Sequence, residues 1–180
     1  MTMAQMAALE FADLRALDLA VLRSLSTAQI GALGSEQITQ LRESQVAALS
    51  TAQIASLDSA DLAALNDLQL AALSTGQVRA LGAGQLASLA TNDLNALVTS
   101  QFAPLTSIQL AGLSTTQIAH LESQDLRALS SASLRALSTA QFDALTSDQM
   151  SQLTTAQIAG LSPTQVRGLS MTDLNAVSTA

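Results

Sequence analysis

The chain has 180 residues, no cysteine and a net charge of −7, and only 12% of its residues are charged and 2% aromatic. Without cysteine it has no disulfide and no thiolate metal site. The negative balance disfavours nucleic acid and anionic membranes, so we expect no nucleic-acid partner and no membrane insertion. With so few charges, we expect a surface made mostly of Ser, Thr, Gln and Ala.

An eight-residue pattern runs through the whole chain without a change of phase. In the unit from Leu25 to Ala32, position one is Leu, position two a hydroxyl residue, position five Gln and position six apolar. Position one is Leu in every repeat from Leu9 to Leu169, and position six is always apolar. The chain therefore holds 22 repeats and four further residues, and repetition of this kind fixes the architecture.

Each repeat carries a complete signal for the start of a helix. Ser26 and Gln29 have the spacing of a capping box, and Leu25 and Ile30 that of a hydrophobic staple. Pro163 directly follows a cap serine, at the first helical position that proline favours. The pattern predicts about six residues of helix, a sharp corner at the Leu-Ser step, and then the next helix.

Two other architectures fail on periodicity. In one continuous helix, eight residues advance about 800°, so the apolar stripe would rotate by about 80° per repeat. In a β-solenoid, the odd spacings of five and three between apolar residues would place them on opposite faces of a strand. Helices this short are marginal alone and must stack, so we predict an all-α fold, an α-solenoid of very short helices.

The number of repeats per coil is predicted from aspartates at position five. All of them fall in odd-numbered repeats, so their separations are multiples of sixteen residues. They are Asp13, Asp61, Asp93, Asp125 and Asp173. This parity favours two repeats (sixteen residues) per coil, with antiparallel helices and one Asp-bearing wall.

We expect a single solenoid over residues 1–180. Residues 1–24 are atypical N-terminal end repeats, because apolar groups occupy positions that are usually polar, at Met3, Phe11, Leu19 and Val21. We interpret these groups as sealing the core. The regular array covers residues 25–180 and ends mid-repeat, because residues 177–180 begin a new helix start. We therefore expect the array either to continue in a larger parent protein or to stack end to end with another copy, and lateral self-association is also possible.

Two further features predict local detail. Pro104 is expected to push Ala103 out of helical geometry. Six of the seven arginines occupy position seven, so this position is expected to face solvent.

No residue set points to catalysis. His120 is the only histidine and, placed beside Leu121, is typical of a helix end or surface. The position-five aspartates lie 32 or 48 residues apart, whereas calcium needs six or more oxygens at one place, so we expect them to replace Gln near the helix dipole. No strand precedes the glycines around Ala83, so they do not indicate a phosphate loop. We predict no catalytic residue, no metal, no cofactor and no enzyme activity.

The repeats LSTAQIAS, LSTTQIAH and LTTAQIAG share the motif L-S-T-x-Q-[IV]-x-A. The motif resembles octapeptide arrays in very large bacterial surface and secreted proteins of adhesin or haem-utilisation type. The resemblance covers the whole chain and implies a rod-like spacer or stalk segment of a larger secreted or cell-surface protein. The alternative is a solenoid scaffold that binds a protein or peptide on one face. Departures from the repeat are scattered, which favours the structural role.

Overall fold

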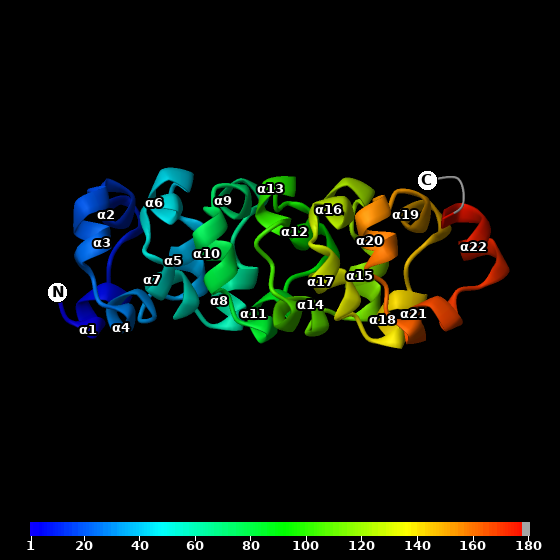
Figure 1. Ribbon diagram of the computed structural model, residues 1–180. Coiled ribbons are helices and arrows are strands. Elements are labelled where there is room, and N and C mark those ends of the chain that lie inside the picture. Colours follow the sequence, from blue (N-terminus) through cyan, green and yellow to red (C-terminus); the bar gives the residue numbers. More distant parts are fainter. Residues whose placement is uncertain (178–180) are drawn as a thin grey trace.

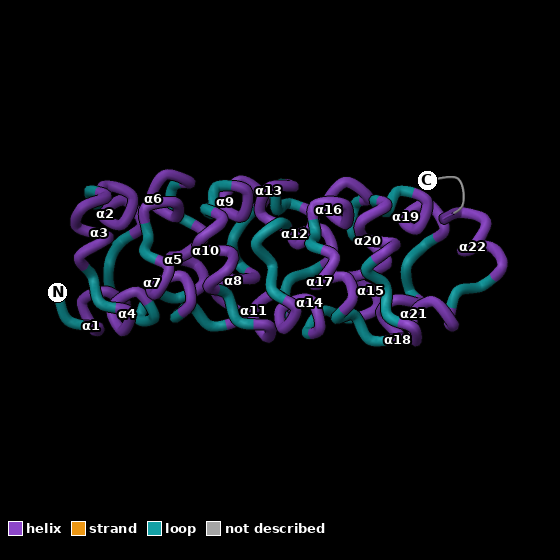
Figure 2. Tube along the Cα trace, in the orientation of Figure 1, coloured by secondary structure: helices purple, strands orange, loops and turns teal. Residues whose placement is uncertain are grey.

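The computed structural model describes residues 1–177, and within them the chain forms helices and no strand. The helices wind into coils that follow one another along one axis, so the molecule is elongated, with α1 near one end and α22 at the other (Figure 1). Figure 2 shows the regular alternation of short helices and loops. The predicted all-α solenoid of very short helices is confirmed.

The helices are 4–7 residues long. Their bounds are α1 Met3–Ala7, α2 Phe11–Ala16, α3 Leu19–Ser24, α4 Thr27–Ile30, α5 Ser35–Thr39, α6 Glu43–Ala48, α7 Thr51–Ala55, α8 Ser59–Ala63, α9 Asp67–Ala71, α10 Thr75–Ala80, α11 Ala83–Ala87, α12 Thr91–Asn95, α13 Thr99–Phe102, α14 Ser107–Ala111, α15 Thr115–His120, α16 Ser123–Ala128, α17 Ser131–Arg135, α18 Thr139–Asp143, α19 Ser147–Ser151, α20 Thr155–Ala159, α21 Pro163–Gly168 and α22 Met171–Val177.

Helix α10 illustrates why the repeat starts and stops where it does. Ser74 has an extended backbone, and its hydroxyl accepts a hydrogen bond from the backbone N–H of Gln77 at 3.2 Å. The Gln77 side chain accepts in return from the Ser74 backbone N–H at 2.7 Å, which completes the capping box. Leu81 ends the helix in an extended conformation, with φ −62° and ψ 140°. The predicted corner at the Leu-Ser step is therefore confirmed, and Pro163 does occupy the first turn of α21.

The prediction for the residue before Pro104 is wrong. Ala103 keeps helical angles, with φ −55° and ψ −40°, and directly follows α13, which has only four residues. The preference of proline against a helical predecessor is a bias, and the chain turns after Ala103.

The prediction of two repeats per coil is also wrong. The main contacts join each helix to the third one along the chain, as in α7 with α10 and α13 with α16. Hydrogen bonds between successive coils join residues 25 to 31 positions apart, whereas three octapeptides span 24 residues and four span 32. One coil therefore holds between three and four repeats. Helices of one or two turns are too short to turn back in pairs and still enclose two rows of large apolar side chains.

Positions one and six form one continuous core from Met6 to Leu153. Position six is the more deeply buried, and its side chains are almost all at 0–2% exposure. The core begins within residues 1–24, where Met6, Leu14 and Leu22 are fully buried. The additional apolar side chains there do not seal it, because Met3 is 57% exposed.

Position seven faces solvent, as predicted, since every arginine at that position is exposed. The expectation of end-to-end stacking rested on the last coil and on the unfinished repeat that begins at residue 177. In that coil Leu174 is 44% exposed and Leu169 is half-buried, while residues 178–180 lie outside the described residues.

Candidate functional site

The most distinctive chemical feature is a row of position-five glutamines, which we call the glutamine ladder. In each member, the side-chain Nε2 donates to two backbone carbonyls of the preceding coil, 28 and 31 residues earlier, at 2.5–3.4 Å. The members are Gln37, Gln45, Gln53, Gln69, Gln77, Gln85, Gln101, Gln109, Gln117, Gln141, Gln149, Gln157 and Gln165. All are buried except Gln85, which is half-buried.

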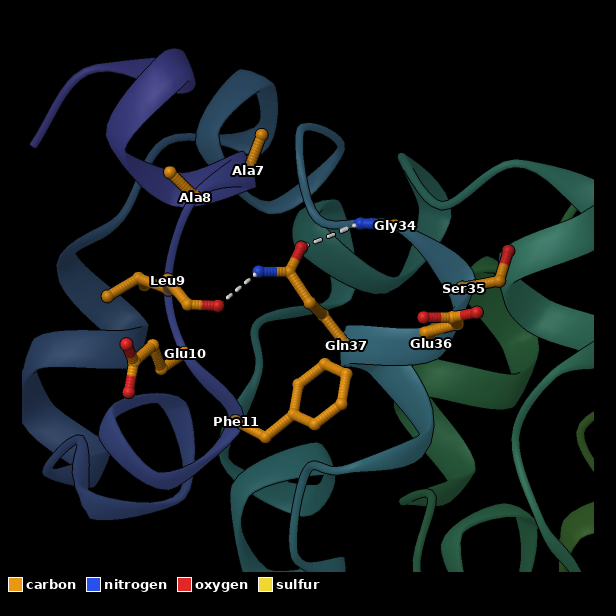
Figure 3. Close-up of a pocket in the computed structure, with 9 residues that line it drawn as sticks. All are labelled: Ala7, Ala8, Leu9, Glu10, Phe11, Gly34, Ser35, Glu36 and Gln37. Atoms are coloured by element: carbon orange, nitrogen blue, oxygen red, sulfur yellow. Dashed lines mark hydrogen bonds between the residues drawn. The ribbon is translucent and has the colours of Figure 1, made fainter.

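Gln37 shows how one amide serves two purposes (Figure 3). Its Oε1 accepts a hydrogen bond from the backbone N–H of Gly34 at 3.0 Å, within its own helix start. Its Nε2 donates to the carbonyls of Leu9 at 2.9 Å and Met6 at 3.0 Å, in the preceding coil. The amide therefore fixes the start of α5 and joins α5 to the corner that precedes α2. A buried side chain of this kind is tolerated because each of its polar atoms is paired.

The expectation that Gln belongs to the surface is therefore wrong. A signal for its second role is present in the sequence, however. Gln stays at position five where position two has no hydroxyl to complete a capping box, after Gly34, Arg42, Gly82 and Val98. In these repeats only half of the capping box remains, because the Gln Oε1 still accepts from the position-two N–H at 2.6–3.0 Å. Capping therefore accounts for Gln less fully here than in the repeats that carry a hydroxyl.

Three buried residues replace Gln at position five. Ser133 keeps part of the contact, because its Oγ donates to the Leu105 carbonyl, 28 residues earlier, at 3.0 Å. Asp61 instead accepts from the Ser35 hydroxyl at 2.7 Å, and Asp125 accepts from the Thr99 hydroxyl at 2.6 Å. Each hydroxyl lies 26 residues earlier, on the preceding coil.

Burial raises the pKa of both carboxyl groups. For Asp61, burial is the main cause, the Ser35 hydroxyl opposes it, and the negative charge of Asp58 raises the pKa further. For Asp125, burial is again the main cause that raises the pKa, the Thr99 hydroxyl lowers it, and the negative charge of Glu122 raises it further. These aspartates do more than replace Gln beside the helix dipole, because they face the preceding coil.

The other position-five aspartates lie in different surroundings. Asp13 is exposed and Asp93 half-buried. Asp173 accepts from the backbone N–H and the hydroxyl of its own cap residue Ser170. The expected Asp-bearing wall needs two alternating walls, and a coil of three to four repeats does not provide them.

The remaining predicted candidates take structural positions. His120 is the last residue of α15 and is exposed, with its Nδ1 2.8 Å from the Thr116 carbonyl. Its own carbonyl accepts from Asn95 Nδ2 at 2.7 Å. The glycines on either side of Ala83 begin α11 as part of the repeat. In the described part of the chain, no three His, Asp or Glu side chains gather in a way that could hold a metal ion.

Within the described residues, hollows lie between coils, and two of them involve residues named above. The first, of about 430 Å³, is bounded by residues 7–11 and the start of α5 at residues 34–37, with Glu10, Phe11 and Glu36 in its wall (Figure 3). The second, of about 260 Å³, lies between residues 95–99 and the start of α16, and Asp125 lines it.

The fold and the ladder together define a class of protein, an α-solenoid built from tandem octapeptides that are joined by buried amides. The model of the ALTTAQ repeat matches residues 6–43, 54–91, 86–123 and 118–155. The matches begin at intervals of 48, 32 and 32 residues, which are whole numbers of octapeptides. Because they cover more than half of the chain, the chain belongs to the ALTTAQ repeat family. No curated protein matches it significantly.

Each helix within residues 1–177 is too short to span the apolar layer of a bilayer.

Proposed function

We propose that this chain is a rod-like spacer or stalk segment of a larger secreted or cell-surface protein, and that it has no catalytic role. The observation that carries the proposal is the continuity of the structure. One core runs from Met6 to Leu153, and the side-chain amides of the glutamine ladder join successive coils along it. A structure in which each coil contacts only its neighbours extends in one direction as repeats are added.

Two features of the sequence support this setting. The octapeptide motif L-S-T-x-Q-[IV]-x-A resembles arrays in large bacterial adhesin-type proteins, and this resemblance implies a spacer segment. Only 12% of the residues are charged, so a rod of this kind has a surface suited to close lateral packing.

Small-angle scattering tests the rod directly. We would compare the chain with a variant in which residues 25–88, eight whole octapeptides, are duplicated in phase. The maximum dimension should increase in proportion to the added repeats, while the radius of gyration of the cross-section stays constant. A wider cross-section with an unchanged maximum dimension would contradict the proposal.

One observation favours the alternative, a scaffold that binds a protein partner. Leu68 and Ile108 occupy position four of their repeats and are 67% and 77% exposed. A second copy of the chain is the partner most easily tested. If these side chains mediate association, the sedimentation coefficient should rise with concentration and the rise should vanish with Leu68→Thr and Ile108→Thr. A monomer at all concentrations would exclude a second copy of the chain as the partner.

A further inference from the structure

Position five allows Gln, Ser and Asp to be compared in nearly equivalent places. A ladder glutamine such as Gln77 donates to a corner leucine 28 residues earlier, Leu49, at 2.7 Å. Ser133 has a much shorter side chain and still donates to the corresponding Leu105 carbonyl at 3.0 Å. A carboxyl group at this position, intermediate in length, is therefore long enough to reach the same carbonyl.

Asp61 and Asp125 interrupt the ladder only because an ionised carboxylate has no hydrogen to donate. The carbonyls that lie 28 residues earlier belong to Leu33 and Leu97, and no Gln amide donates to them. Asp61 and Asp125 are only 6% and 2% exposed as whole residues, and each accepts a hydrogen bond from the preceding coil, so each lies in the interface between coils.

We propose that Asp61 and Asp125 are proton-dependent contacts between coils. When protonated, each carboxyl group donates its O–H to the carbonyl of Leu33 or Leu97 and completes the ladder. When ionised, it leaves that carbonyl without a donor. The other carboxyl oxygen accepts from the Ser35 or Thr99 hydroxyl in both states, so the side chain keeps its orientation as the proton binds or leaves.

The surroundings of Asp61 favour the proton. Burial and the charge of Asp58 raise its pKa, against the opposing hydrogen bond from Ser35. Among the helices next to it, α4 and α11 carry no charged residue, and α5 carries only the exposed Glu36. No cation on these helices stabilises the ionised form.

The surroundings of Asp125 act in the same direction. Burial and Glu122 raise its pKa, and Thr99 lowers it. Helix α13 has no charged residue, while α12 contributes Asp93 and α19 contributes Asp148. The one cation on its own helix, Arg127, is exposed at position seven.

The sign of the pH dependence follows from the raised pKa values. A group whose pKa is higher in the folded than in the unfolded chain contributes stability that is complete below the unfolded value. That contribution is lost as the pH rises through the folded value. The solenoid should therefore tighten at these two places on acidification and loosen as the pH rises through the raised pKa values of the folded chain.

Carboxyl and carbonyl ¹³C NMR of the full chain tests the proposal. The titration midpoints of Asp61 and Asp125 should lie above the ordinary aspartate range, and the Leu33 and Leu97 carbonyl shifts should follow the same midpoints. The carbonyl of Leu41, which accepts from Gln69, serves as the control and should not titrate. Ordinary midpoints, or leucine carbonyls that do not respond, would overturn the proposal.

Variants distinguish the effect of a hydrogen bond donated by Asp61 and Asp125 from the effect of burying their side chains. Ser35→Ala should raise the midpoint of Asp61 alone, and Thr99→Val that of Asp125 alone. The double variant Asp61→Asn and Asp125→Asn supplies donors that do not titrate, so its urea midpoint at pH 7 should exceed that of the parent and depend less on pH. The matched control is Asp67→Asn with Asp143→Asn, which changes the charge equally at two exposed sites. Identical pH profiles for the two double variants would refute the proposal.

Discussion

Replacing Gln77 by alanine tests the glutamine ladder at the centre of the array. The side chain is 2% exposed and makes three hydrogen bonds, accepting from the Ser74 N–H and donating to the carbonyls of Val46 and Leu49. The Val46 carbonyl also accepts from the Leu49 N–H and so keeps a partner. Gln77→Ala therefore leaves two groups without their partners, the Ser74 N–H and the Leu49 carbonyl.

The Leu49 carbonyl is buried, whereas Ser74 is exposed and water can bond to its N–H. One orphaned buried group costs about 1–3 kcal/mol, so Gln77→Ala should lower the free energy of unfolding by about that amount. Urea denaturation followed by far-UV circular dichroism measures this loss. Gln124→Ala is the matched control, because Gln124 lies exposed on α16 and donates only to Glu122, so its loss should stay below about 0.5 kcal/mol. A cost for Gln77→Ala no larger than that of the control would refute the ladder as a source of stability.

Two further pairs of variants test which positions are buried and how closely adjacent coils pack. Leu73→Asp should cost more than about 3 kcal/mol because Leu73 is only 3% exposed, whereas Arg79→Ala should leave the urea midpoint nearly unchanged; equal effects would show that the assignment is wrong. At Gly84 no atom lies within 4 Å of an added Cβ, so Gly84→Ala should stabilise helix α11 by about 0.4–1 kcal/mol. Gly112→Ala should instead lower the melting temperature, because its Cβ would lie 2.8 Å from the Cβ of Ala83. Thermal melts of the two variants measure both effects, and a higher melting temperature for Gly112→Ala would contradict this packing.

The sequence predicts the local structure because the interactions that determine it are local. A cap and its glutamine are three residues apart, as in Ser74 and Gln77, and the apolar positions one and six follow from the same short unit. For this reason the helix starts, the corners and the two buried rows are all visible in a single octapeptide.

The arrangement of coils could not be predicted because it depends on residues about 28 positions apart. The capping role of Gln77 concealed its contact with Leu49, and nothing within one octapeptide specifies the angle between successive helices. The parity of the aspartates suggested two walls, but Asp61 and Asp125 are related to the preceding coil by 26 residues, through Ser35 and Thr99.

Disulfide trapping tests the central claim, a coil of three to four repeats, most directly. Because the chain has no cysteine, pairs can be introduced without interference. Ala83→Cys with Gly112→Cys joins adjacent coils across 29 residues, where the Cβ atoms lie within disulfide reach after a small relaxation. Ala96→Cys with Gly112→Cys spans the sixteen residues of a two-repeat coil. Mild oxidation should close the first pair rapidly in the folded monomer and leave the second reduced, and the reverse result would contradict this architecture.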